Sequence, residues 1–167
     1  MRYLWLFICC WINSVMATDL GLFSSSFKNG NNIPKNYTCE GQNKSPPFTW
    51  VNAPPDTKSF VLIAEDPGAP TGTWYHWILV NIPANVRDIS ENQIPANSAM
   101  IKNSWKKKEY DGPCPPPGQM HHYFFTLYAL NTTINLDTPI PIEVSEVQGI
   151  IATHTVGMAR VMGTYRR

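Results

Sequence analysis

The sequence has no large excess of either charge. Its 13 lysines and arginines stand against 12 aspartates and glutamates in a chain of 167 residues. Proteins that bind nucleic acids nonspecifically present a strongly basic surface. The locally basic stretch at residues 105–108 (WKKK) is short enough to be an exposed loop. The composition therefore argues against a nucleic-acid partner.

Long apolar segments are also scarce. The N-terminal run in residues 1–17 (MRYLWLFICCWINSVMA) falls short of the roughly 20 apolar residues that cross a bilayer. An arginine, an apolar run and compact residues up to Ala17 are typical of a secretory signal peptide. An amphipathic or buried N-terminal helix is the alternative. We expect no transmembrane anchor, one mature domain at residues 18–167, and a secreted or periplasmic protein.

Cysteine is sparse. Cys9 and Cys10 lie in the N-terminal apolar run, which leaves Cys39 and Cys114 in the expected mature domain. An even number of cysteines in an exported protein suggests a disulfide. Closing a loop of about 75 residues would stabilise the fold by roughly 4 kcal/mol in the chain-entropy model. Two separate buried thiols are the alternative.

Recognisable catalytic signatures are absent as well. The sequence contains neither Gly-x-Ser-x-Gly nor His-Glu-x-x-His, the motifs of serine hydrolases and zinc proteases. Asp66, His76 and His121 could form a two-histidine, one-carboxylate metal site, but no close histidine spacing supports it. Cys114 can serve as a catalytic thiol only if it is not disulfide-bonded. We expect no enzyme, metal or cofactor; a metal-dependent or thiol enzyme is the minor alternative.

Fifteen prolines divide the chain into short segments, which argues against a helical bundle. Segments rich in β-branched and aromatic residues predict strands instead. The strongest are residues 59–65 (SFVLIAE), 76–82 (HWILVNI) and 121–130 (HHYFFTLYAL); weaker candidates are 48–51, 99–105 and 161–165.

One helix is expected near the C-terminus. Residues 145–148 (SEVQ) fit a capping box, and Val147, Ile150, Ile151 and His154 follow at the spacing of one helix face. We interpret His154 as a packed or capping residue. The pattern predicts one mainly β domain of two packed antiparallel sheets with a C-terminal helix.

Alternation along a strand indicates which side chains share a face. His121 and Tyr123 are expected on one face of their strand, and His122 on the other. In the middle strand, His76, Ile78 and Val80 are expected to share a face.

Asp66 and His76 flank a loop rich in proline and glycine. If residues 59–66 and 76–82 pair antiparallel, both side chains lie at the same edge of the sheet. His121 also begins a strand and could join them. A second stiff loop, residues 111–118 (DGPCPPPG), carries a few backbone N–H groups that could converge on an anion. A connector without a ligand is the alternative.

Taken together, these segments resemble the phosphatidylethanolamine-binding protein family, and within it the bacterial and archaeal branch named Raf-kinase-inhibitor-like. The resemblance covers residues 27–167, nearly the whole expected domain. The motifs that carry it are YTCEG (37–41), NKSPP (43–47), DPGAP (66–70), WYHW (74–77), GPCPPPG (112–118) and GTY (163–165).

The resemblance implies a β-sandwich with a small pocket for phosphate-like anions at one edge. It also implies a cis peptide bond before Pro70. The family's pocket residues fall on Asp66, His76 and His121, with Trp74 and Tyr123 beside them and the backbone of Gly112 and Cys114 near the anion.

Two positions depart from the family pattern. Gly68 replaces the usual second aspartate of the loop after Asp66, which removes a negative charge from the rim. His122 replaces the arginine that usually follows the second histidine, and alternation directs it to the opposite face. Neither departure removes an expected pocket residue.

The expected function follows from this chemistry. A histidine beside Asp66 has its protonated form favoured, and two such rings supply charge-assisted hydrogen bonds to one phosphate. Trp74 offers a wall or a cation–π face to an ammonium group. We expect a non-enzymatic binding protein for phosphate or phosphorylated head groups such as phosphoethanolamine, which modulates a partner protein. A secreted inhibitor of serine proteases or kinases is the alternative.

Overall fold

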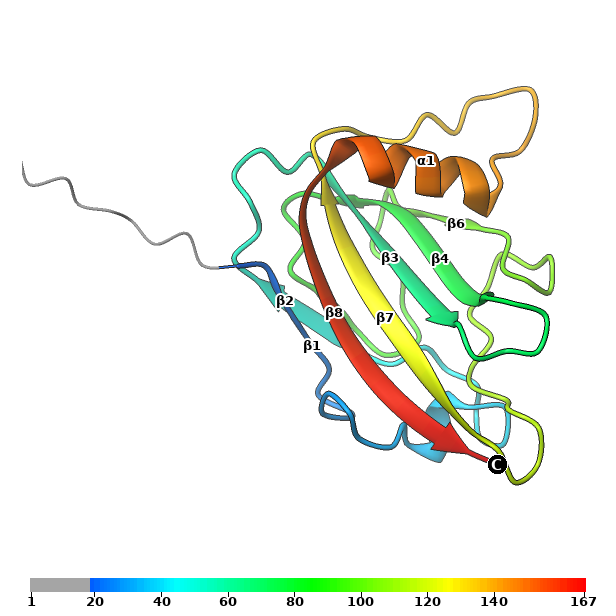
Figure 1. The fold of residues 1–167 in the computed structure, drawn as a ribbon. Helices are drawn as coiled ribbons and strands as arrows, with labels where there is room; N and C mark the ends of the chain where they lie inside the picture. The colour runs from blue at the N-terminus through cyan, green and yellow to red at the C-terminus, as the bar shows by residue number, and fades with distance from the viewer. Residues whose placement is uncertain (1–18) are drawn as a thin grey trace, which may run out of the picture.

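The computed structural model describes residues 19–167 (Figure 1). The predicted signal peptide and its cleavage point lie outside the described residues. Within residues 19–167, no helix is both long enough and apolar enough to cross a membrane.

Two antiparallel sheets form the architecture, as predicted. The larger sheet has the strand order β6-β4-β3-β7-β8, and the smaller has the order β1-β2-β5. The larger sheet comprises β3 (Ser59–Asp66), β4 (Trp74–Pro83), β6 (Ala99–Ile101), β7 (Met120–Leu130) and β8 (Thr155–Arg166). The smaller comprises β1 (Gly21–Phe23), β2 (Phe48–Val51) and β5 (Asp88–Ile89). A 3-10 turn, η1, spans Lys35–Tyr37, and the helix α1 spans Val144–His154.

An aromatic core lies between the two sheets. The ring centroids of Phe48 and Phe125 are 4.9 Å apart, and those of Trp50 and Phe60 are 5.4 Å apart. All four side chains are almost fully buried. Each contributes roughly 1.5–3 kcal/mol through removal of apolar surface from water.

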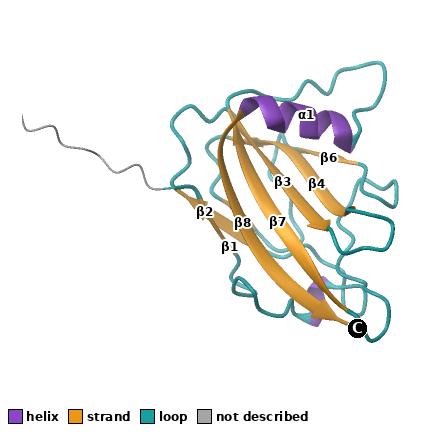
Figure 2. Ribbon diagram, viewed as in Figure 1, coloured by secondary structure: helices purple, strands orange, loops and turns teal. Residues whose placement is uncertain are grey.

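The other face of the larger sheet packs against α1 (Figure 2). Val147 of α1 is fully buried in a cluster with Val61 of β3 and Ile78 of β4. Because β3 has a core on each side, it reads as a continuous apolar run rather than an alternating one.

The predicted helix exists, but its capping box begins two residues earlier than expected. Glu143 is the N-cap: its side chain accepts the N–H of Glu146, and the Glu146 carboxylate accepts the N–H of Glu143 at 2.9 Å. The earlier start packs Val144 against the same cluster as Val147. His154 is the last helical residue, and its Nδ1 lies 3.0 Å from Oδ1 of Asn131.

The strand predicted at residues 99–105 ends at Ile101. The buried Asn103 turns the chain, because its Oδ1 accepts the N–H groups of Trp105 and Lys107 at 3.0 and 3.1 Å. Lys106 between them has a φ of 65°. This local hydrogen bonding competes successfully with strand extension.

The bond before Pro70 is trans, as are all peptide bonds in residues 19–167, so the expected cis bond is absent. The loop turns instead at Gly72, whose N–H donates to the carbonyl of Ala69 at 3.1 Å. The φ of Gly72 is +98°, a conformation that glycine adopts without steric cost.

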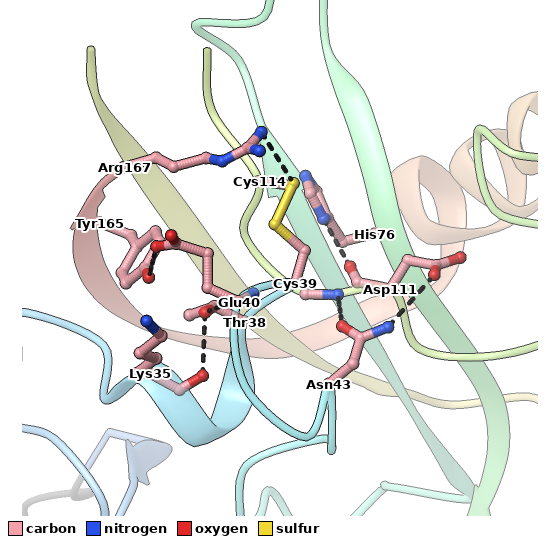
Figure 3. Close-up of a disulfide and its surroundings, with 11 residues drawn as sticks. Lys35, Thr38, Cys39, Glu40, Asn43, His76, Asp111, Cys114, Tyr165 and Arg167 are labelled. Atoms are coloured by element: carbon pink, nitrogen blue, oxygen red, sulfur yellow. Dashed lines mark hydrogen bonds between the residues drawn. A yellow bond between two sulfur atoms is a disulfide. The ribbon is translucent and has the colours of Figure 1, made fainter. Parts of the chain in front are cut away.

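The predicted disulfide between Cys39 and Cys114 is present, with Cα atoms 5.4 Å apart (Figure 3). It joins the segment after η1 to the proline-rich loop before β7. Two separate buried thiols are therefore excluded.

We expect complete reduction of the disulfide to lower the free energy of unfolding by about 4 kcal/mol, because the closed loop restricts the unfolded chain. Urea unfolding with and without a reductant measures the change. The Cys39→Ala/Cys114→Ala variant is the control, since the reductant should leave its midpoint unchanged. An unaltered wild-type midpoint after full reduction would contradict the prediction.

Candidate functional site

A β-bulge sets the direction of His76. In the pairing of β3 with β4, Ala64 lies opposite Trp77, whereas Glu65 lies opposite Tyr75. His76 is thus an extra residue without a partner in β3. A bulge of this kind rotates the side chain out of simple alternation.

The consequence is that His76 does not share a face with Ile78, contrary to the sequence prediction. Ile78 and Val80 lie on the α1 side of the sheet, whereas Tyr123 belongs to the core between the sheets. The rings of His76 and Tyr123 have centroids 5.2 Å apart. The bulge has turned His76 toward the inner core.

Asp66 and His121 form a buried pair at the end of β3 and the start of β7. His121 Nδ1 lies 2.6 Å from Asp66 Oδ2, and the residues are 8% and 3% exposed. The other carboxylate oxygen, Oδ1, accepts the N–H of Gly68 at 2.8 Å. Gly68, one of the departures from the family pattern, therefore holds the carboxylate through its backbone.

His76 has a different partner. Its Nδ1–H donates to the carbonyl oxygen of Asp111, with 2.6 Å between the two atoms (Figure 3). The Asp111 carboxylate accepts from Nδ2 of Asn103 at 2.9 Å and from Nδ2 of Asn43 at 3.4 Å. These contacts hold Asp111 in place. The other ring nitrogen of His76, Nε2, has no hydrogen-bond partner within residues 19–167.

The two histidines are electrostatically unequal. Burial lowers the pKa of His76, and this effect outweighs the opposing influence of the Asp111 backbone and of the Asp66 and Asp111 charges. The carboxylate of Asp66 hydrogen-bonds to the ring of His121, whereas it acts on His76 only through its charge, which raises the pKa of His76 by less than burial lowers it.

A cavity of about 290 Å³, here called the histidine pocket, lies among these residues. It is lined by six of the seven predicted site residues, namely Asp66, Trp74, His76, Cys114, His121 and Tyr123. Its walls are completed by Ala69, Pro70, Thr71, Trp105, Pro115 and Pro116. Burial raises the pKa of Tyr123, so its phenol is neutral and can donate a hydrogen bond.

Gly112 does not line the pocket. It is buried, and its N–H donates to Oδ1 of Asn43 at 2.7 Å. A Cβ at this position would collide with the carbonyl oxygen of Tyr37. Gly112 thus permits close packing of two loops, and its N–H is not free for an anion. His122 is exposed, on the face opposite His121, as predicted.

Two residues near the histidines were not identified from the sequence. Trp105 packs edge-on against Trp74 and His76, with centroids 5.3 and 5.1 Å away. Its position next to three lysines favoured an exposed loop, and nothing local indicated the pocket. Gln119 places Oε1 3.2 Å from Nε2 of His121. Alternation from His121 back to Gln119 could have indicated this contact.

Metal ligation finds little support in the geometry. Within the described part of the chain, no group of three or more histidine, cysteine, aspartate or glutamate side chains is arranged to hold a metal ion. The Nδ1 atoms of His76 and His121 are also both engaged in hydrogen bonds.

The low pKa of His76 predicts a pH-dependent stability. The unfolded chain takes up a proton at this ring below about pH 6.5, whereas the folded protein resists it. The contribution of the neutral ring is therefore complete above about pH 6.5 and is lost as pH falls toward the folded pKa. We expect urea unfolding of His76→Gln to show a flatter decline between about pH 6.5 and 5 than the wild type.

The exposed His122 supplies the matched control, since His122→Gln should retain the wild-type slope. NMR titration of the His76 ring gives the pKa directly. A value at or above about 6.5 in the folded protein would refute the prediction.

The sequence and fold both have identified relatives. The model of the phosphatidylethanolamine-binding protein family matches residues 23–166. A UPF0098 protein of Methanothermobacter thermautotrophicus is 39% identical over 153 residues, covering 89% of this chain and 99% of the relative. LppC of Mycobacterium tuberculosis, which is named as a lipoprotein, is 37% identical over 150 residues, covering 89% of this chain and 73% of the relative.

Two solved structures share the architecture. A phosphatidylethanolamine-binding protein homologue from Chlamydia trachomatis, CT736, has a TM-score of 0.81 and 32% identity, and the match covers 89% of this chain and 98% of that one. YbcL of E. coli has a TM-score of 0.83 and 29% identity, with 90% and 99% covered. The histidine pocket thus lies in a fold shared with these proteins, and the chain belongs to the phosphatidylethanolamine-binding protein family.

Proposed function

We propose that the protein is a non-enzymatic receptor for a phosphate-like anion, held in the histidine pocket. The observation that carries the proposal is the unpartnered Nε2 atom of His76 in a ring that is 4% exposed. Nε2 is not one of the fully buried unpartnered atoms of the described chain, so it stays accessible from the cavity, where a ligand can supply its missing hydrogen bond. The neutral phenol of Tyr123, whose ring lies 5.2 Å from that of His76, is a further hydrogen-bonding group for the anion.

The pocket is suited to a phosphate that carries an organic group. Its volume of about 290 Å³ exceeds the size of a single phosphate. The indole rings of Trp74 and Trp105 form an aromatic wall that suits an ammonium group through cation–π attraction. Phosphoethanolamine, a phosphomonoester, combines both features.

The chemistry of the lining favours binding over catalysis. Asp66 is held by His121 and Gly68, and the sulfur of Cys114 is bonded to Cys39. A nucleophile needs an adjacent base to activate it. Among the described lining residues, the hydroxyl of Thr71 makes no hydrogen bond with either histidine.

We place the protein outside the cytoplasm. Disulfides persist in oxidising compartments such as the periplasm, and the Cys39–Cys114 bond spans 75 residues of this chain. The lipoprotein name of the mycobacterial relative is consistent with export. The residues that would direct export are the expected signal peptide at 1–17.

Titration with inorganic phosphate and then phosphoethanolamine, followed by NMR of backbone amides and histidine rings, tests the proposal. We expect saturable shifts at Asp66, His76 and His121, because these residues line one cavity. His76→Ala should weaken binding at least tenfold, as loss of one buried hydrogen bond of about 1.4 kcal/mol or more implies.

The matched control is His122→Ala, which removes an exposed histidine from the opposite face of β7 and should leave affinity unchanged. Absence of any shift with millimolar ligand would overturn the proposal and direct attention to protein partners, including proteases and kinases.

A further inference from the structure

Both ring nitrogens of His121 are engaged at the histidine pocket. His121 Nδ1 lies 2.6 Å from a carboxylate oxygen of Asp66, and its Nε2 lies 3.2 Å from the amide oxygen of Gln119. The pocket therefore contains one buried carboxylate, paired with His121. The residues that line the cavity within the described chain include no lysine or arginine.

His76 offers an acceptor to the cavity. Its Nδ1 carries the proton that bonds to the Asp111 carbonyl, so Nε2 of the neutral ring presents a lone pair. The titratable groups around it are Asp66 on β3, Asp111 in the loop before β7, Tyr123 on β7, and His121, which lines the same cavity. Burial lowers the pKa of His76 despite these neighbours, which keeps the neutral ring dominant.

The arginine beside Cys114 does not discriminate between anions. Arg167 is exposed, and its Nη1 lies 3.8 Å from Sγ of Cys114. An exposed guanidinium is screened by water and attracts sulfate and phosphate alike. Discrimination between anions therefore falls to the buried groups.

Those buried groups prefer an anion that can donate a hydrogen bond. A fully ionised anion presents only acceptors, and it would face the Nε2 lone pair of His76 and the carboxylate of Asp66. A phosphate with a P–OH group presents a donor as well. Its proton can be shared with His76 Nε2, whereas an anion without one must draw a proton from solvent onto a ring that resists it.

We infer that the histidine pocket selects phosphate groups that carry a proton, with His76 Nε2 as the acceptor, and rejects sulfate and phosphodiesters. This inference rests on the proposed anion-binding function. The ligand is then inorganic phosphate or a phosphomonoester. A phosphodiester lipid head group lacks the P–OH donor and is excluded, even though its charge is suitable.

Four small anions separate the contribution of the anion's charge to the binding affinity from the contribution of its P–OH donor. At pH 8, inorganic phosphate keeps one P–OH group, whereas sulfate, methyl phosphate and dimethyl phosphate have none. At pH 5.5, methyl phosphate gains a P–OH group, because the second pKa of a phosphomonoester is about 6. Dimethyl phosphate then carries the same single charge without a donor.

Calorimetric or NMR titration of the wild-type protein with each anion measures the affinities. At pH 8, we expect inorganic phosphate to bind at least about tenfold tighter than the other three anions. At pH 5.5, methyl phosphate should bind at least about tenfold tighter than dimethyl phosphate and sulfate. Sulfate has the same charge and no donor at both pH values. The change in its affinity between pH 8 and 5.5 therefore measures the effect of protein protonation, and the affinities of the other anions are corrected by it.

Asp66→Asn should reduce the ratio of the affinity for phosphate to that for sulfate, because it removes the buried negative charge and introduces an N–H donor. His122→Gln, on the exposed face, should keep the wild-type affinity ratio. Equal affinity of the wild type for all four anions would overturn the inference and leave anion binding intact. No binding of any of them would overturn the proposed function itself.

Discussion

The direction of one side chain, His76, decides whether the histidine pocket exists. Simple alternation along β4 would place this ring among the aliphatic residues under α1, where it would have no acceptor for its N–H. The bulge between Ala64 and Glu65 in the register with β3 turns it to the inner face instead. There it meets the carbonyl of Asp111 and the ring of Tyr123. The hydrogen bond proposed between Nε2 of His76 and an anion depends on this rotation.

The ring of His76 hydrogen-bonds to the carbonyl of Asp111, and contacts between two loops fix the position of this carbonyl. The loop before β7 is bound to the segment after η1 by the Cys39–Cys114 disulfide and by the N–H of Gly112 on Asn43. The N–H of Cys39 also donates to the carbonyl of Pro113 at 3.2 Å. Preorganisation of this kind reduces the ordering cost of binding. The disulfide thus has a role in the site as well as in stability.

The two buried histidines have different partners. His121 bonds to the carboxylate of Asp66. His76 has a backbone carbonyl at its Nδ1, and desolvation by burial lowers its pKa. A pocket with one buried carboxylate and one neutral acceptor differs from a simple basic anion site. Its proposed selectivity between anions arises from which pocket atoms donate and which accept hydrogen bonds, rather than from net charge.

The sequence by itself indicated the central strands of the larger sheet and an even pair of cysteines, because apolar runs and residue counts are local signals, and its ordered motifs, through resemblance to a known family, named six of the twelve residues that line the pocket. It could not determine the face of His76, since a bulge arises from the pairing of two distant strands. Gly112 was expected to offer its N–H to an anion, but the neighbouring loop supplies Asn43 as the acceptor. Trp105 enters the pocket because the Asn103 turn folds it back, and no local pattern encodes that contact. Tertiary structure alone decided which donors and acceptors remain free, because the hydrogen bonds of His76, His121 and Gly112 with Asp111, Asp66 and Asn43 join residues far apart in the chain.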